Sequence, residues 1–153
     1  MSLWDAGESG VQEQEQAQDG PVHVHVRVGA ERYALPVEHV LEVDRLGEIA
    51  PVPGAGGSSL GVRNHHGQVL AVFDLARVFG IPRQGDAVRI VVAVEAGRRA
   101  GLAIDEVIDV GPLPHVTEES PSPYLSGSTL LHGHVVGVVD VGGVLDALET
   151  GGA

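Results

Sequence analysis

The sequence predicts a mainly β protein with two or three short helices, arranged as two similar lobes. One reason is composition: aromatic residues make up only 3% of the chain, while 22 glycines and 9 prolines punctuate it. With valine as a main apolar residue, such a chain favours many short strands joined by tight turns. The other two reasons are segments in which apolar and polar residues alternate, and an internal repeat.

The repeat is a fourteen-residue pattern that occurs at residues 66–79 and again, 66 positions later, at residues 132–145. Six positions are identical, and six more exchange one small or apolar residue for another. Each copy predicts a turn at His-Gly, an apolar strand, an aspartate that caps a helix, and a short helix. The duplication indicates two lobes side by side, which is more typical of scaffolds than of enzymes with one deep pocket.

The N-terminal segment, residues 1–20, differs from the rest of the chain. It carries five acidic residues, no lysine and no arginine, with glutamines between them. Because so polar a segment buries too little apolar surface to offset its ordering entropy, we expect a disordered acidic tail. We place the folded domain at residues 21–149 and a flexible C-terminus at 150–153.

The first half of the domain predicts two hairpins, a single strand between them, and two short helices. Pro36 can open a helical turn up to residue 40, because its fixed φ suits a first helical position. Asp74 is an N-cap candidate for a helix that ends at Gly80. The predicted strands cover residues 22–28, 32–35, 41–43, 60–65 and 68–73, with turns at Gly29-Ala30-Glu31 and His66-Gly67 and a loop at 51–57.

The second half predicts a hairpin around Gly97, a short strand, a long connection and a last hairpin. Four prolines in residues 111–123 indicate the connection. Asp140 is expected to cap the closing helix, which carries Val144, Leu145 and Leu148 at helical spacing. The predicted strands cover residues 88–95, 99–104, 107–110, 125–131 and 135–139.

Charge and composition exclude several classes of protein. A formal net charge of −12 disfavours nucleic acid as a partner. The absence of cysteine excludes disulfides and thiolate metal sites, and it fits a reducing compartment. Neither a signal-peptide pattern nor an apolar run of about 18 residues is present. We therefore expect a cytoplasmic protein without direct membrane insertion.

Six segments are informative as an ordered set: residues 31–43, 51–55, 60–64, 68–75, 101–107 and 124–127. This set, spread over about residues 22 to 149, resembles the CheW-like coupling proteins of bacterial chemotaxis. The resemblance implies two five-stranded, SH3-like β-barrels packed together. It also implies an adaptor without catalytic residues or cofactors, whose partners are the regulatory domain of a CheA-type histidine kinase and the cytoplasmic tip of a chemoreceptor.

Two positions depart from the family pattern. His66 stands where family members usually carry an arginine, and Ala71 stands where they carry a proline. Histidine lacks the permanently charged fork of arginine. The change could weaken a partner contact, match an adjusted partner, make the contact depend on pH, or be neutral. Carried over by position, the residues implied at partner interfaces are Val40, Glu42, Gly61, Val62, Asn64, His66 and Val107.

These positions differ in how well chemistry supports a binding role. Val62 and Val107 are well explained as core residues, since valine in a strand is usually core, whereas Glu42, a carboxylate within an apolar strand, should face solvent or a partner. The groove between the lobes would then receive a receptor helix, and a contact of that kind needs exposed apolar anchors beside the polar residue.

The eight histidines allow a competing hypothesis, a small metal-dependent β-barrel enzyme built on histidine pairs. The pairs are His23 with His25, His65 with His66, and His132 with His134. Zinc sites need three or four converging ligands, and the sequence signals no third ligand. We therefore predict no metal site and expect solvent-facing histidines on the polar faces of strands. A CheW-like scaffold in a signalling system unrelated to motility also remains open.

Overall fold

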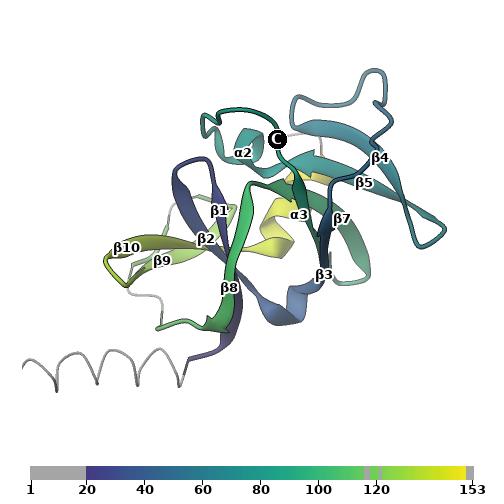
Figure 1. Cartoon of the computed structure of the whole chain (residues 1–153). Helices are drawn as coiled ribbons and strands as arrows, with labels where there is room; N and C mark the ends of the chain where they lie inside the picture. The colour runs from purple at the N-terminus through teal and green to yellow at the C-terminus, as the bar shows by residue number, and fades with distance from the viewer. Residues whose placement is uncertain (1–19, 116–117, 121, 151–153) are drawn as a thin grey trace, which may run out of the picture.

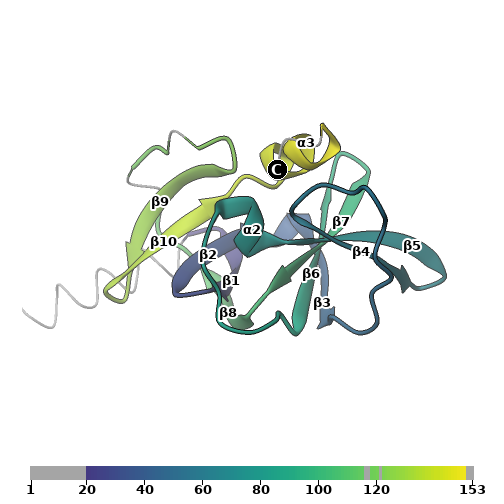
Figure 2. The ribbon, with the colours of Figure 1, turned by 90° about the horizontal axis from the view of Figure 1, so that it is seen from above.

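The computed structural model describes residues 20–115, 118–120 and 122–150, and their strands form two five-stranded sheets. Lobe 1 has the strand order β8-β1-β2-β10-β9, and lobe 2 has the order β3-β6-β7-β5-β4. Figures 1 and 2 show the two lobes side by side. The mainly β, two-lobed architecture predicted from the sequence is confirmed.

The element bounds agree closely with the predicted ranges. Lobe 1 contains β1 (Val22–Val28), β2 (Glu31–Pro36), β8 (Glu106–Pro112), β9 (Leu125–Leu131) and β10 (His134–Val139). Lobe 2 contains β3 (Val40–Arg45), β4 (Ser59–His65), β5 (Gln68–Asp74), β6 (Arg89–Glu95) and β7 (Arg98–Ile104). The helical elements are the 3₁₀ turn η1 (Val37–His39) and the helices α2 (Leu75–Phe79) and α3 (Val141–Glu149).

The two copies of the repeat adopt the same local structure. His66 and His132 have left-handed φ angles of 52° and 49°, and each precedes a glycine with positive φ that completes the turn. The Asp74 carboxylate accepts a hydrogen bond from Ala76 N at 3.1 Å, which caps α2. The Asp140 carboxylate accepts one from Gly143 N at 2.9 Å, which caps α3. The predicted N-caps are therefore confirmed.

The structural duplication extends beyond this repeat. The hairpins β1–β2 and β6–β7 have the same register at an offset of 67 positions, so that His25 opposite Ala34 corresponds to Val92 opposite Gly101. The edge strands β3 and β8 correspond in the same way, because Glu42 pairs with Val92 and Asp109 pairs with His25.

The largest apolar core lies between the lobes and draws residues from both sheets and both helices. Phe79 of α2 stacks on Tyr33 of β2, with ring centroids 4.5 Å apart. Helix α3 buries Val141, Val144 and Leu145 in the same core, and Figure 1 shows it between the two sheets. Smaller apolar clusters fill the interior of each lobe. The shared core holds the lobes in a defined relation.

The prediction that the paired histidines face solvent is wrong for three of them. His23, His25 and His65 are each less than a tenth exposed. Alternation correctly indicated two distinct faces of β1, but residues on both faces are buried, so the second face also meets protein. His23 and His25 satisfy their buried rings by hydrogen bonds to the carbonyl oxygens of Pro21 and Gly111.

Two further predictions fall mostly outside the described residues. The predicted acidic tail is described only at Gly20, and the predicted C-terminal segment only at Thr150. In the part of the chain that the structure describes, no helix has the length and apolar character needed to cross a membrane.

Candidate partner-binding site

The candidate site is centred on a carboxylate held by two histidines. Glu42 lies in the middle of β3, and His65 and His66 lie at the end of β4 and in the turn that follows. Nε2 of His65 donates a hydrogen bond to Glu42 Oε1 at 2.5 Å. Nε2 of His66 lies 3.2 Å from both carboxylate oxygens. We call these three residues the Glu42 cluster.

The cluster closes a seam between the two edges of one sheet. Strands β3 and β4 are the outermost strands of lobe 2, at opposite ends of its strand order. Arg63 of β4 reaches the same seam, donating to the Arg45 carbonyl oxygen at 2.6 Å and pairing with Asp44 at 3.2 Å. Side chains therefore join two edges that the backbone ladder leaves unpaired, which protects them from pairing with other chains.

The turn geometry explains how two adjacent histidines reach one carboxylate. Neighbouring residues of a regular strand point to opposite faces, but the left-handed φ of His66 turns its side chain back toward β3. The Asn64 side chain accepts a hydrogen bond from Gly67 N at 2.8 Å, which fixes this turn. The rings of His65 and His66 lie 4.4 Å apart. The side chain of His65 is 2% exposed, and that of His66 is 74% exposed.

The local charges favour an ionised Glu42. Hydrogen bonds from His65, and then from His66, lower the pKa of the Glu42 carboxyl below its ordinary value. The backbone N–H of Arg45 lowers the pKa of Asp44 on the same strand. At neutral pH this surface thus presents a partly exposed carboxylate in a fixed position.

Exposed apolar side chains lie next to Glu42 along β3, on the face of the strand opposite its carboxylate, as the alternating burial of β3 shows. Leu41 and Val43, its neighbours on β3, are 53% and 41% exposed, and Val69 beyond the turn is 78% exposed. Anchors of this kind beside a fixed polar group are what a docked partner element requires. The site therefore combines apolar contact area with one oriented charge.

The structure separates the seven sequence-predicted site residues into distinct places. Glu42, Asn64 and His66 come together at the seam of lobe 2. Gly61 is buried at a bulge in β4, where its φ is +128° and an added Cβ would lie 2.2 Å from the Ala50 carbonyl oxygen. The backbone conformation and the close approach of Ala50 therefore explain why this position is glycine.

The remaining three are valines of intermediate exposure. Val62 pairs with Ala50 through two backbone hydrogen bonds of 2.8 and 2.9 Å. Val40 and Val107 occupy corresponding positions on β3 and β8, and both pack against the shared core. Val107 also lines a hollow where β8 of lobe 1 faces Asp44 and Arg45 of lobe 2.

Sequence reasoning missed His65 and Arg63 as members of the site. His65 was noted only as one of an adjacent histidine pair, and Arg63 only as part of a matching segment. The signal that could have found them is the contact between edge strands, which requires knowing that β3 and β4 meet although 13 residues (46–58) separate them. No local periodicity carries that information.

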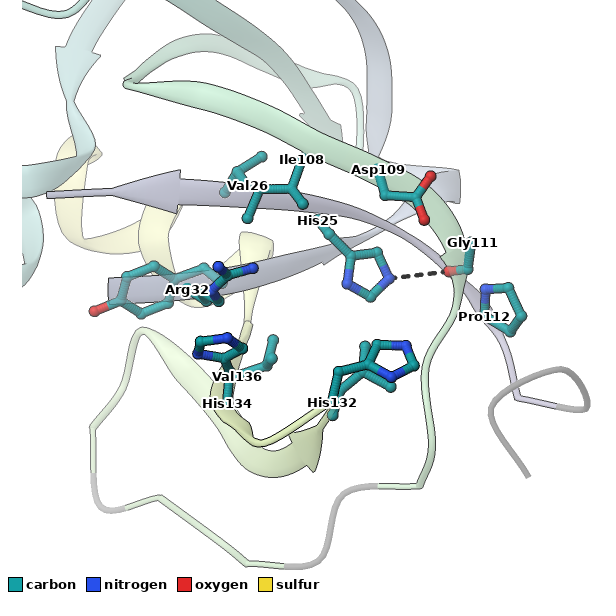
Figure 3. Close-up of a pocket in the computed structure, with 12 residues that line it drawn as sticks. His25, Val26, Arg32, Ile108, Asp109, Gly111, Pro112, His132, His134 and Val136 are labelled. Carbon is teal, nitrogen blue, oxygen red and sulfur yellow. Dashed lines mark hydrogen bonds between the residues drawn. The ribbon is translucent and has the colours of Figure 1, made fainter. Parts of the chain in front are cut away.

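In lobe 1, the region that corresponds to the Glu42 cluster of lobe 2 holds a cavity of about 300 Å³. Figure 3 shows His132 and His134 on one side of this cavity, Asp109 on the other, and the ring of His25 between them. Nε2 of His25 donates to the Gly111 carbonyl oxygen at 3.2 Å, and burial lowers the pKa of His25 below its ordinary value of 6.5. The seam that side chains close in lobe 2 is therefore partly open in lobe 1.

Two packed β lobes with an exposed apolar edge beside an oriented carboxylate define a two-lobed interaction module. A family model for the CheW-like domain matches residues 23–149, and the chain belongs to this family.

Several known proteins are similar to this chain. Protein FrzA of Myxococcus xanthus is 37% identical over 125 residues, which cover 80% of this chain and 76% of FrzA. Chemotaxis protein CheW of Rhizobium meliloti is 26% identical over 133 residues, covering 80% of this chain and 86% of that protein. The crystal structure of the scaffolding protein TtCheW from Thermoanaerobacter tengcongensis shares the fold, with a TM-score of 0.72 and 24% identity over 79% of this chain and 89% of that one.

Proposed function

We propose that this chain is a non-enzymatic, cytoplasmic adaptor that couples a chemoreceptor to a CheA-type histidine kinase. The observation that carries the proposal is the match of the CheW-like domain over residues 23–149, together with the two-lobed fold. The names of two similar proteins support it, since one is a chemotaxis protein and another a scaffolding protein. Domain bounds of 21–149 are part of this proposal.

The regulatory domain of the kinase docks on the edge of lobe 2. There Leu41 and Val43 supply apolar contact area, and Glu42 supplies a charge whose position the two histidines hold. Holding the carboxylate in place before binding lowers the ordering cost of association, which favours affinity. A partner with a complementary cationic group would gain both the attraction to the carboxylate and the lower ordering cost.

The receptor tip docks as a helix in the hollow between the lobes. Val107 of β8 and Val43 of β3 line this hollow, together with Asp44, Arg45, Arg89 and Glu106. The mixture of two valines with charges of both signs suits an amphipathic helix that carries charged flanks. Of the seven predicted positions, Val107 lies here and Glu42 lies at the kinase edge, so the two partners would occupy adjoining surfaces, with Val43 at their border.

The titratable groups of the repeat and of strand β1 support a role without catalysis. Asp74 and Asp140 occupy corresponding positions, and each is engaged in capping a helix. His23 and His25, one of the pairs that a metal-dependent enzyme would use, are buried and hydrogen-bonded to backbone carbonyl oxygens. An adaptor accounts for these residues without a reaction.

Co-purification from the native cell tests the proposal. The chain carries a tag at one terminus, and the tag alone serves as the control. We expect a CheA-type kinase and a chemoreceptor to be recovered together under gentle conditions. Recovery of a kinase without a chemoreceptor would instead favour a scaffold in a signalling system unrelated to motility. Recovery of neither would refute the coupling function.

A further inference from the structure

We propose that Glu42, His65 and His66 form a binding site for a divalent transition-metal ion of the zinc class. One ligand atom from each residue can be chosen so that all three lie within 4.8 Å of one another. Two imidazole nitrogens with one carboxylate oxygen are a ligand set that zinc accepts, with a fourth position left for water or another ligand. The sequence supplied the histidine pair, and β3 supplies the third ligand.

The distances fit a tetrahedral ion. Zinc bonds of about 2.0–2.2 Å place neighbouring ligand atoms of a tetrahedron roughly 3.3–3.6 Å apart. His66 Nε2 already lies 3.2 Å from each Glu42 oxygen. The separation between His65 Nε2 and Glu42 Oε1 is 2.5 Å, so the carboxylate must withdraw by about an ångström. The Glu42 side chain is one-third exposed, so it can make that shift once the ion replaces the hydrogen bonds from the two histidines.

The donor chemistry selects the class of ion. Imidazole nitrogen suits zinc, copper and nickel, whereas magnesium and calcium prefer sites made of oxygen alone. The site also suits a cation electrostatically, because Glu42 places a carboxylate among the ligands in a chain whose net charge is −12.

The surroundings limit the affinity. Nδ1 of His65 is buried and has no hydrogen-bond partner. When Nε2 binds a metal, Nδ1 carries the ring proton, and such a proton is usually donated to a carboxylate or a carbonyl. Missing partners of that kind typically cost 10–100-fold in metal affinity. With three protein ligands and this defect, we expect weaker binding than at structural zinc sites.

The inference goes beyond the adaptor function and does not depend on it, because zinc binding is measured on the chain alone. Lobe 1 offers a matched comparison. His132 occupies the same left-handed turn position as His66, but Leu131 stands in place of His65. Within the described residues, the Glu42 cluster is the sole group of three histidine or acidic side chains with converging ligand atoms.

The test is a zinc titration of tag-free protein in competition with a chromophoric chelator. We expect one zinc ion per chain, and at least about tenfold weaker binding in His66→Ala and in Glu42→Gln. His132→Ala, the matched control, should bind as the wild type does. No zinc binding, or equal affinity in wild type and His66→Ala, would overturn the site, as would a loss confined to His132→Ala.

A cobalt titration adds a readout of geometry. Co²⁺ in a tetrahedral site of nitrogen and oxygen ligands should give intense visible absorption, which His66→Ala should lose. Weak octahedral bands in the wild type would contradict the site. His66 is exposed, so its variant should fold, and an unchanged circular dichroism spectrum would confirm this. Failure of either titration leaves the kinase co-purification unaffected, so the two proposals can fail separately.

Discussion

The interiors of the two lobes share a backbone frame but differ in chemistry. In lobe 2, Ile90 and Val92 point into an apolar cluster with Leu70 and Val72. The corresponding residues of the lobe 1 hairpin are His23 and His25, both buried. The same strand register therefore supports an apolar core in one lobe and a cavity lined in part by histidines in the other. The shared hydrogen-bonded ladder therefore accommodates different inward-facing side chains in the two lobes.

The seams differ in a related way. Glu42 in lobe 2 corresponds to Asp109 in lobe 1, and His66 corresponds to His132. In lobe 2 the acid and the turn histidine are in hydrogen-bond contact, whereas in lobe 1 they stand on different sides of the cavity (Figure 3). The exposed apolar flanks are similar, since Ile108 and Val110 match Leu41 and Val43. The oriented carboxylate is thus what distinguishes the proposed kinase edge.

Exchanging the interior residues should have the largest effect. Val92→His places an imidazole in the apolar interior of lobe 2, where desolvation and overpacking should destabilise the fold by at least about 3 kcal/mol. The reverse change, His25→Val, removes one hydrogen bond and should cost only about 1 kcal/mol at neutral pH. Urea denaturation measures both.

The pH dependence of His25→Val sharpens this comparison. Because burial lowers the pKa of His25, the unfolded chain takes up a proton more readily, and wild-type stability falls as the pH drops below about 6.5. His25→Val lacks this loss, so the difference in stability between wild type and variant should become smaller in acid. Equal destabilisation by the two exchanges would contradict the account of the two interiors.

Two glycines of the β4–β5 hairpin should respond very differently to alanine. In Gly61→Ala the new Cβ meets the Ala50 carbonyl oxygen, and the φ of +128° is strained, so a loss of about 3 kcal/mol is expected. At Gly67, where nothing lies within 4 Å, only strain remains and about 1 kcal/mol is expected. Thermal unfolding measures the loss of stability in both variants. A loss in Gly61→Ala as small as that in Gly67→Ala would contradict the backbone explanation and favour a binding role for Gly61.

A smaller effect is expected from the pH dependence of the Glu42 cluster. The pKa of Glu42 is lowered in the folded state, so its contribution to stability is complete above its ordinary value of 4.5 and is lost as the pH falls through the lowered value. The difference in denaturation midpoint between wild type and Glu42→Gln should therefore narrow in acid. A difference that stays constant down to about pH 3 would mean that the histidines do not stabilise the ionised carboxylate.

Local signals were sufficient for most of the fold. The His-Gly turns, the aspartate caps and the two-residue alternation each depend on neighbours in sequence, and the structure confirms them at His66, Asp74 and Asp140. The resemblance added the two-lobed arrangement, which local patterns could only suggest through the repeat.

The site could be predicted only in part, because it is formed by contacts between distant strands. Glu42 was correctly singled out as a carboxylate in an apolar strand, yet its partners became visible only when β3 and β4 met. The burial of His25 was missed for the same reason, since alternation cannot tell an inner strand from one with a solvated face. The periodicity of a sequence does not predict which residues come together when the edge strands of a sheet meet.

The central claim, that the edge of lobe 2 binds the kinase, is tested most directly by comparing two matched double variants. Leu41→Ser with Val43→Ser alters the lobe 2 edge, and Ile108→Ser with Val110→Ser alters the corresponding edge of lobe 1. Both pairs are exposed, so folding should be preserved. Calorimetry with the regulatory domain of the kinase should show at least about tenfold weaker binding for the first and wild-type affinity for the second. Equal losses, or a loss confined to the second, would contradict the account.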